Sequence, residues 1–132
     1  MTDAPDLLEP HVVRALLFAR HRPTRNTVTV LTKTVGLSLA DVARAVDVVP
    51  ATVGRWRRGG VPRHAPMYRL RDFAGVVAIL AGTLTAKGIR QWLWAPNARL
   101  DGEPPIMVFA ENAEGRTRVT AEARFLAGDG VA

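Results

Sequence analysis

The fold is decided by residues 38–60, whose sequence is SLADVARAVDVVPATVGRWRRGG. In its first half the spacing i, i+3, i+4 and i+7 places four apolar residues on one helical face, namely Leu39, Val42, Ala43 and Val46. Ser38 and Asp41 form a capping-box pattern there, because a serine hydroxyl can accept from a first-turn amide. Pro50 suits the first turn of a second helix, where its missing N–H needs no partner. The stretch therefore predicts a helix-turn-helix, a motif whose second helix lies in the DNA major groove.

The second helix of this motif can be read by angle, because successive residues turn by about 100°. Val53 and Trp56 then point into the protein, whereas Arg55 and Arg58 point away from it. An arginine fork can bond both acceptors of guanine, so Arg55 is the candidate for a base edge, although such arginines can also be ordinary solvated side chains. The residues expected to contact DNA are Thr52, Arg55, Arg57, Arg58 and Arg63, with Arg57, Arg58 and Arg63 on phosphates.

The charge of the chain is unevenly distributed. Its 18 Lys and Arg residues outnumber its 12 Asp and Glu residues, and the formal net charge of +6 suggests an anionic partner. Residues 20–71 hold 11 basic residues against two acids, whereas residues 73–132 hold six of each sign. The positive charge therefore surrounds the helix-turn-helix, as phosphate binding requires, and the neutral second half has a different task.

Length and composition indicate a folded chain of 132 residues with 48% hydrophobic content, either one domain or two small ones. We divide it into an N-terminal helical and DNA-binding region, residues 1–63, and a C-terminal helical partner-binding region, residues 64–132. There is no cysteine, which excludes disulfides and sulfur-ligated metals and fits a reducing compartment. The acidic first residues lack a signal pattern, and the apolar run 74–81 is too short to span a bilayer. We therefore expect a cytoplasmic protein.

No segment shows the alternating pattern of a strand, so the sequence predicts an all-α fold. Residues 27–35 are locally ambiguous, because their Thr and Val content favours a strand, but a short helix is the preferred interpretation. Beyond the helix-turn-helix, helices are expected at 6–20, 66–84, 85–95, 105–111 and 116–126, with a basic loop at 21–26, a turn at Glu114-Gly115 and a flexible tail from 127.

The expected helix 66–84 is apolar over a wide face. Its apolar residues repeat at alternating spacings of three and four, which is typical of a coiled-coil seam, and they are Met67, Leu70, Ala74, Val77, Ala81 and Leu84. Such a face must be covered, either by the rest of the chain or by a second copy.

A second informative stretch is WLWAPNARLDGEPP, residues 92–105. Pro96 is expected to end the preceding helix, because a residue before proline avoids the α conformation. Asn97 can bond backbone groups at the turn, and Gly102 permits a backbone angle that other residues resist. With Leu100 as a plug between two helices, these residues predict a rigid corner, which is either purely structural or presents a surface to a partner.

This stretch resembles the W-L-x-x-P-N-x-x-L-x-G-x-x-P run in the C-terminal domain of the Xre/MbcA/ParS antitoxins. The matching residues are Trp92, Leu93, Pro96, Asn97, Leu100, Gly102 and Pro105. The resemblance covers roughly residues 36–128, including the helix-turn-helix that precedes this domain in the family.

The resemblance implies the antitoxin half of a toxin–antitoxin pair, with no cofactor of its own. Its partner would be a RES-domain toxin that consumes NAD⁺, and the C-terminal domain would bind that toxin and block its active site. The helix-turn-helix would bind operator DNA and repress the shared operon, in a homodimer or a hetero-oligomer with the toxin. The residues expected at the toxin interface are Trp92, Asn97, Leu100, Arg116, Arg124, Phe125 and Leu126, with the tail from Ala127.

Two residues depart from the turn of that family, since Asp47 stands for Gly and Val49 for Ser. Val49 offers no side-chain cap, which costs about 1 kcal/mol, and Gly54 inside the second helix costs a similar amount relative to alanine. Two alternatives therefore remain open. One is a stand-alone helix-turn-helix transcriptional regulator whose C-terminal half only dimerises; the other is a protein-interaction adaptor whose helix-turn-helix no longer reads DNA.

The residue pattern argues against an enzyme. His11, His21 and His64 are scattered and lack paired carboxylates at helical spacing. No glycine-rich phosphate loop follows a strand, and no nucleophile has an evident base. The sequence predicts neither a metal site nor a cofactor.

Overall fold

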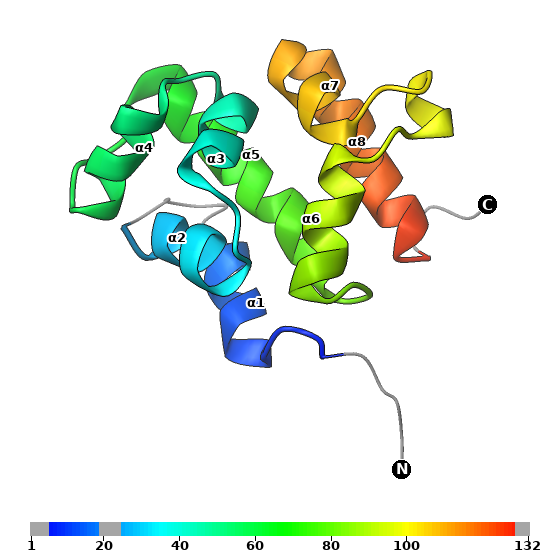
Figure 1. Cartoon of the computed structure of the whole chain (residues 1–132), viewed down its shortest axis with the longest axis horizontal. Coiled ribbons are helices and arrows are strands. Elements are labelled where there is room, and N and C mark those ends of the chain that lie inside the picture. The colour runs from blue at the N-terminus through cyan, green and yellow to red at the C-terminus, as the bar shows by residue number, and fades with distance from the viewer. Residues whose placement is uncertain (1–5, 19–24, 129–132) are drawn as a thin grey trace.

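The computed structural model describes residues 6–18 and 25–128, and the regular elements in those residues are helices (Figure 1). They are α1 (Pro10–Phe18), α2 (Arg25–Thr29), the π-helix η1 (Val30–Thr34), α3 (Leu39–Val46), α4 (Pro50–Arg57), α5 (His64–Ala81), α6 (Ala86–Trp94), the 3-10 helix η2 (Ala98–Leu100), α7 (Pro105–Glu111) and α8 (Ala113–Leu126). The predicted all-α fold is confirmed. The expected helix end at Arg20, most of the basic loop and the last four residues of the tail lie outside the described residues.

Helix α5 runs through the middle of the molecule and packs against α1, α3, α6 and α8 (Figure 1). The residues Leu70, Ala74 and Val77 of its apolar seam are 0% exposed. The chain itself therefore covers the seam. A single cluster of buried residues reaches from Leu16 in α1 to Ala123 in α8, across the boundary between residues 63 and 64. The division into two domains at that boundary stays a prediction.

The predicted helix-turn-helix is formed by α3 and α4. The Oγ of Ser38 accepts from the Asp41 amide at 2.9 Å, and the Ser38 amide donates to Asp41 Oδ2 at 3.1 Å, so the capping box is complete. Pro50 occupies the first turn of α4, and Val49 before it makes no side-chain cap. Residues 27–34 are helical, because α2 continues directly into η1, so the preferred helix is confirmed up to the residue before Val35.

Three helix limits differ from the sequence expectation. The first helix begins at Pro10 rather than at residue 6, since the residue before a proline avoids the α region and Leu7 instead bridges Thr85. The central helix spans residues 64–81 rather than 66–84. The last helix begins at Ala113, because Asn112 Oδ1 accepts from the Gly115 amide at 2.7 Å and caps it. Glu114 and Gly115 therefore lie in its first turn rather than in a separate turn.

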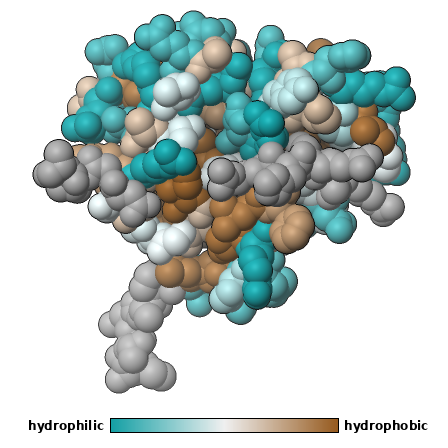
Figure 2. Space-filling model, turned by 180° about the vertical axis from the view of Figure 1, so that it is seen from behind, coloured by the Kyte–Doolittle hydropathy of each residue, from teal (hydrophilic) through white to brown (hydrophobic). Residues whose placement is uncertain are grey.

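The surface is apolar in places. Seen from behind, the molecule carries an apolar area in the middle of that face, with hydrophilic residues around it (Figure 2). Among the described residues Phe18 is 73% exposed and Leu17 is 40% exposed at the end of α1. Within the described part of the chain, every helix is too short or too polar to cross a membrane.

Candidate functional site

The first candidate surface is the outer side of α4, which lies at one edge of the molecule (Figure 1). Val53 is 0% exposed and Trp56 4% exposed, as the helical angles predicted. Arg55 and Arg58 are exposed on the opposite side. Because α4 packs on α2 and α3 through its apolar side, its arginine side is turned outward.

The basic side chains of this surface are not used inside the chain. Among the described residues, none of Arg55, Arg57, Arg58 and Arg63 makes an ion pair. Arg63 is exposed, whereas Arg57 is half-buried along the side of α4. The half-buried Thr52 lies one turn before Trp56. These cations are free to attract an anionic partner, although their contacts with DNA stay a prediction.

Arg69 is a basic residue of this region with a different task. Its Nε donates to the carbonyl of Val46 at 3.0 Å, and its guanidinium lies 3.9 Å from the carboxylate of Asp47. A cation at the C-terminus of α3 satisfies an unpaired carbonyl and opposes the negative end of the helix dipole. Sequence reasoning counted Arg69 with the basic region, but the structure places it in the support of the turn.

The turn between α3 and α4 explains the first departure from the family pattern. Asp47 has φ of 58° and ψ of 52°, the left-handed conformation that a glycine adopts without strain. Its amide closes α3 by donating to the carbonyls of Ala43 and Arg44. An aspartate tolerates this conformation better than most residues, so the turn keeps its shape without glycine.

The second candidate surface surrounds the bend of residues 95–104, and Asn97 organises it. The Asn97 side chain accepts from the Arg99 amide at 2.9 Å, and its carbonyl accepts from the amides of Leu100 and Gly102, both at 2.9 Å. Its own amide donates to the Glu103 carbonyl at 3.2 Å. Gly102 has φ of 82°, as expected for a position that needs glycine. The predicted rigid corner is confirmed.

Helix α8 is fastened to this bend by charged contacts. Arg99 Nε lies 2.7 Å from Glu122 Oε1, and the Arg99 guanidinium stacks 4.0 Å from the ring centre of Phe125. Arg118 reaches Asp101 at 3.3 Å. Two ion pairs and one cation–π contact therefore hold α8 to the bend.

The residues expected at the toxin interface occupy different positions. Phe125 is 40% and Leu126 39% exposed, so Leu126 belongs to the surface rather than to the apolar side of its helix. Arg124 is exposed, while Trp92, Asn97 and Arg116 are half-buried. Leu100 is 1% exposed and plugs the bend from inside, as predicted, while its direct contact with the toxin stays a prediction.

Two hydrogen bonds join the helix-turn-helix side to the bend side. Trp94 Nε1 donates to Asp41 Oδ1 at 3.0 Å, using the carboxylate that also caps α3. Arg90 donates to the Val35 carbonyl at 2.7 Å. Gly36, with φ of 84°, leaves room for this arginine, since a Cβ there would lie 2.8 Å from its guanidinium. Sequence reasoning missed both contacts because their partners are more than 50 residues apart.

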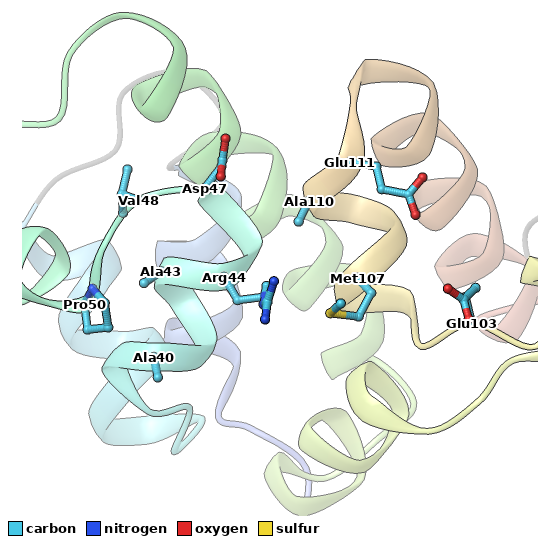
Figure 3. Close-up of a pocket in the computed structure, with 10 residues that line it drawn as sticks. All are labelled: Ala40, Ala43, Arg44, Asp47, Val48, Pro50, Glu103, Met107, Ala110 and Glu111. Carbon is cyan, nitrogen blue, oxygen red and sulfur yellow. The ribbon is translucent and has the colours of Figure 1, made fainter.

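A cleft of about 420 Å³ separates the two surfaces. Figure 3 shows Arg44 of α3 and Met107 of α7 reaching toward each other across it, with Glu111 and Glu103 on the far side. Asp47 adds a third carboxylate to the lining, against the single guanidinium of Arg44. This excess of acid disfavours phosphate, so the candidate DNA surface is confined to the α4 side. In the residues that the structure describes, no three His, Asp or Glu side chains could hold a metal ion.

Comparison with known proteins gives relatives in both sequence and structure, while no protein-family model matches the chain. The chain is similar to a probable mycobacterial cidal antitoxin of Mycobacterium tuberculosis, with 35% identity over 92 residues, 68% of this chain and 77% of that protein. The mycobacterial cidal antitoxin MbcA of Mycobacterium bovis is 32% identical over 81 residues, 61% of this chain and 72% of that protein. A chain of the crystal structure of the M. tuberculosis MbcT–MbcA toxin–antitoxin complex superposes with a TM-score of 0.68 and 27% identity, covering 82% of this chain and 96% of that one.

Proposed function

Because this chain belongs to the family of the mycobacterial cidal antitoxins, we propose that it is the antitoxin that binds and neutralises a partner toxin. The observation that carries the proposal is the joint similarity in sequence and fold to MbcA. The crystal structure to which the chain is similar is that of the M. tuberculosis MbcT–MbcA toxin–antitoxin complex. The family membership confirms the resemblance read from residues 92–105.

The toxin surface of the proposal is the C-terminal half. Its bend is held rigid by the hydrogen bonds of Asn97, and α8 presents Arg124, Phe125 and Leu126 beside it. A rigid surface loses little conformational entropy on binding, which favours affinity. The finer proposal is that the partner is a RES-domain toxin that consumes NAD⁺ and that this surface blocks its active site.

The DNA surface of the proposal is the outer side of α4. The free guanidinium groups of Arg55 and Arg58 support it, because unpaired cations can replace the counterions of DNA phosphates. On this proposal the protein represses its own operon by binding operator DNA, as a homodimer or in a hetero-oligomer with the toxin. A stand-alone regulator would use the same arginines and would need no toxin.

Co-expression with the neighbouring open reading frame tests the proposal. The expected result is that the neighbouring product alone arrests growth and depletes NAD⁺, and that co-expression of this chain restores both and gives a complex that co-purifies. Restored growth without any change in NAD⁺ would contradict the assignment of the partner as a RES-domain toxin, whereas the antitoxin role of this chain would still stand. Absence of both a complex and a rescue would contradict the antitoxin role and favour the stand-alone regulator.

A further inference from the structure

A trough of about 400 Å³ lies between α5 and α8, with one wall completed by α1. Its apolar lining comes from Leu17, Val76 and Ile79. Leu17 is 40% exposed although it is a large aliphatic side chain. Gly75 lies between these residues, and a Cβ placed on it would meet no atom within 4 Å. The trough is therefore open at Gly75, and its accessible apolar surface comes from Leu17 and Ile79, because Val76 is only 1% exposed.

The edges of the trough are positively charged. Arg71 Nε lies 3.4 Å from one oxygen of Asp72, and Arg116 Nε lies 3.7 Å from the other. Arg124 also lines the trough and makes no ion pair among the described residues. Two guanidinium groups thus share the one carboxylate of Asp72, and the third, that of Arg124, has no ion-pair partner among the described residues. A second hollow along α8 contains Asp72, Arg116 and Arg124 as well, so the basic edge continues beyond the trough.

The dimensions of the trough suit a short peptide segment. Arg71, Gly75 and Ile79 follow one another at intervals of four residues on α5, so they form a row along one side of that helix. At a rise of 1.5 Å per residue, this row is about 12 Å long, or about two turns of an α-helix. Two packed helices with an apolar groove between them are a common receptor for an amphipathic segment.

We infer that this trough receives a segment of the partner toxin in which aliphatic side chains alternate with Asp or Glu. The aliphatic side chains would cover Leu17 and Ile79, and the carboxylates would pair with Arg124 and with the two arginines beside Asp72. Nucleic acid fits less well, because a phosphate backbone has no apolar group to bury on this floor. The inference rests on the proposed antitoxin function and adds the chemistry of the partner, together with Leu17, Arg71 and Gly75, to its interface.

Two variants test the trough without disturbing the contacts that hold the helices. Arg124→Glu reverses the unpaired charge, and Gly75→Trp fills the open floor. Arg116 is left intact because it ties α8 to α5 through Asp72. Lys87 supplies matched controls, since it is exposed on α6 and makes no ion pair in the described part of the chain. The controls are Lys87→Glu for the charge change and Lys87→Trp for the bulk.

The measurement is calorimetric binding of the purified toxin from the neighbouring open reading frame to each full-length variant. Arg124→Glu and Gly75→Trp are expected to raise Kd at least tenfold, with the Lys87 variants within twofold of the unsubstituted chain and no melting temperature lowered. Arg124→Lys should restore most of the affinity. The Kd of the unsubstituted chain should rise with salt more steeply than that of Arg124→Glu, since one ion pair has been removed.

The outcomes separate the inference from the function on which it rests. If the unsubstituted chain binds the toxin and the trough variants bind equally well, the trough assignment is wrong and the antitoxin role stands. If the unsubstituted chain binds no toxin, both are wrong. If Arg124→Glu and Gly75→Trp weaken binding of a random 20-base-pair duplex as strongly as the double change Arg55→Ala, Arg58→Ala on α4 does, the trough is a nucleic-acid surface and the inference is overturned.

Discussion

The arginines on and beside α4 and most of those of the C-terminal half, Arg124 excepted, are used in opposite ways. On and beside α4, the guanidinium groups of Arg55, Arg57 and Arg58 make no ion pair with any described residue. In the second half, Arg99 and Arg118 are paired with carboxylates of the same chain, and Arg90 donates a hydrogen bond to a backbone carbonyl. A count of charges does not distinguish these uses, because only the positions of the partners show which cations are free.

The two turns show a similar contrast. The turn of the helix-turn-helix is supported from outside, by Arg69 of α5. The bend at residues 95–104 is supported from within, by the four hydrogen bonds of Asn97 and by the buried Leu100. The bend is therefore a self-contained rigid element, whereas the first turn depends on the packing of the central helix. The predictions below test this difference, beginning with the largest effect.

Leu100→Ala is expected to cause the largest loss in the free energy of unfolding. It removes a side chain that is 1% exposed, and truncation of a buried leucine typically lowers the free energy of unfolding by about 2–5 kcal/mol. Denaturant unfolding followed by circular dichroism measures the loss. Leu126→Ala on the same half is the control, since Leu126 is 39% exposed and its loss should stay within about 0.5 kcal/mol. Similar losses for both would contradict the role of Leu100 as the internal support of the bend.

The double change Arg55→Ala and Arg58→Ala is expected to leave the fold intact, because neither side chain makes an ion pair with a residue that the structure describes. If Arg55 reads a guanine edge, operator binding should weaken by about 1–3 kcal/mol for that contact. The slope of log K against log salt should fall by about 1 for the phosphate contact of Arg58. Fluorescence anisotropy with labelled operator DNA at several salt concentrations measures both quantities. An unchanged affinity and an unchanged salt slope would show that α4 does not contact DNA.

Two glycines offer a matched pair between the regions. A Cβ at Gly115 would overlap the carbonyl oxygen of Val108, so Gly115→Ala should force α7 and α8 apart and cost about 1–3 kcal/mol. A Cβ at Gly54 would lie 3.5 Å from the Arg58 guanidinium and 3.7 Å from Leu39, which is ordinary contact. Gly54→Ala should therefore stabilise the protein by about 0.5–1 kcal/mol. Thermal unfolding of both variants checks the signs, and equal signs would contradict this interpretation of the helix contacts.

Val49→Ser is expected to have an effect as modest as that of Gly54→Ala, a gain of about 1 kcal/mol in the free energy of unfolding. Val49 has the extended backbone of an N-cap residue, with φ of −83° and ψ of 152°, and its side chain is 63% exposed. A serine there can cap α4 without the loss of a buried group. Val49→Ala serves as the control, since alanine cannot cap; a gain of the same size in both variants would show that capping is not the cause.

The sequence predicted the elements whose signals are local. The capping box of Ser38 and Asp41, the first-turn Pro50 and the stop at Pro96 all concern groups within a few residues, and each is in its expected place. The periodic apolar face of α5 also predicted its burial correctly. In residues 27–35 the only local signal was the strand propensity of Thr and Val, and the preferred interpretation, a short helix, was right. The π-helical conformation of residues 30–34 had no signature in the sequence.

What the sequence could not predict depends on distant partners. The Trp94–Asp41 bond joins residues 53 positions apart, and the close approach at Gly115 is set by the packing of α8 on Val108. Leu100 was predicted both as a plug between two helices and as a partner contact. Its burial confirms the first prediction, and the contact with a partner stays a prediction. At the candidate site, the pairing of Arg116 with Asp72 and the freedom of Arg124 follow from how α5 and α8 meet, which no spacing within either helix reveals.

The central claim is the proposal that the outer side of α4 binds DNA and that the C-terminal half binds the toxin. Its most direct test is the Kd of the purified toxin for the Arg55→Ala, Arg58→Ala double variant, beside that of the unsubstituted chain. The account predicts equal toxin binding, within twofold, in the variant whose DNA binding is lost. A tenfold weaker toxin affinity in that variant, or no toxin binding by the unsubstituted chain, would contradict it.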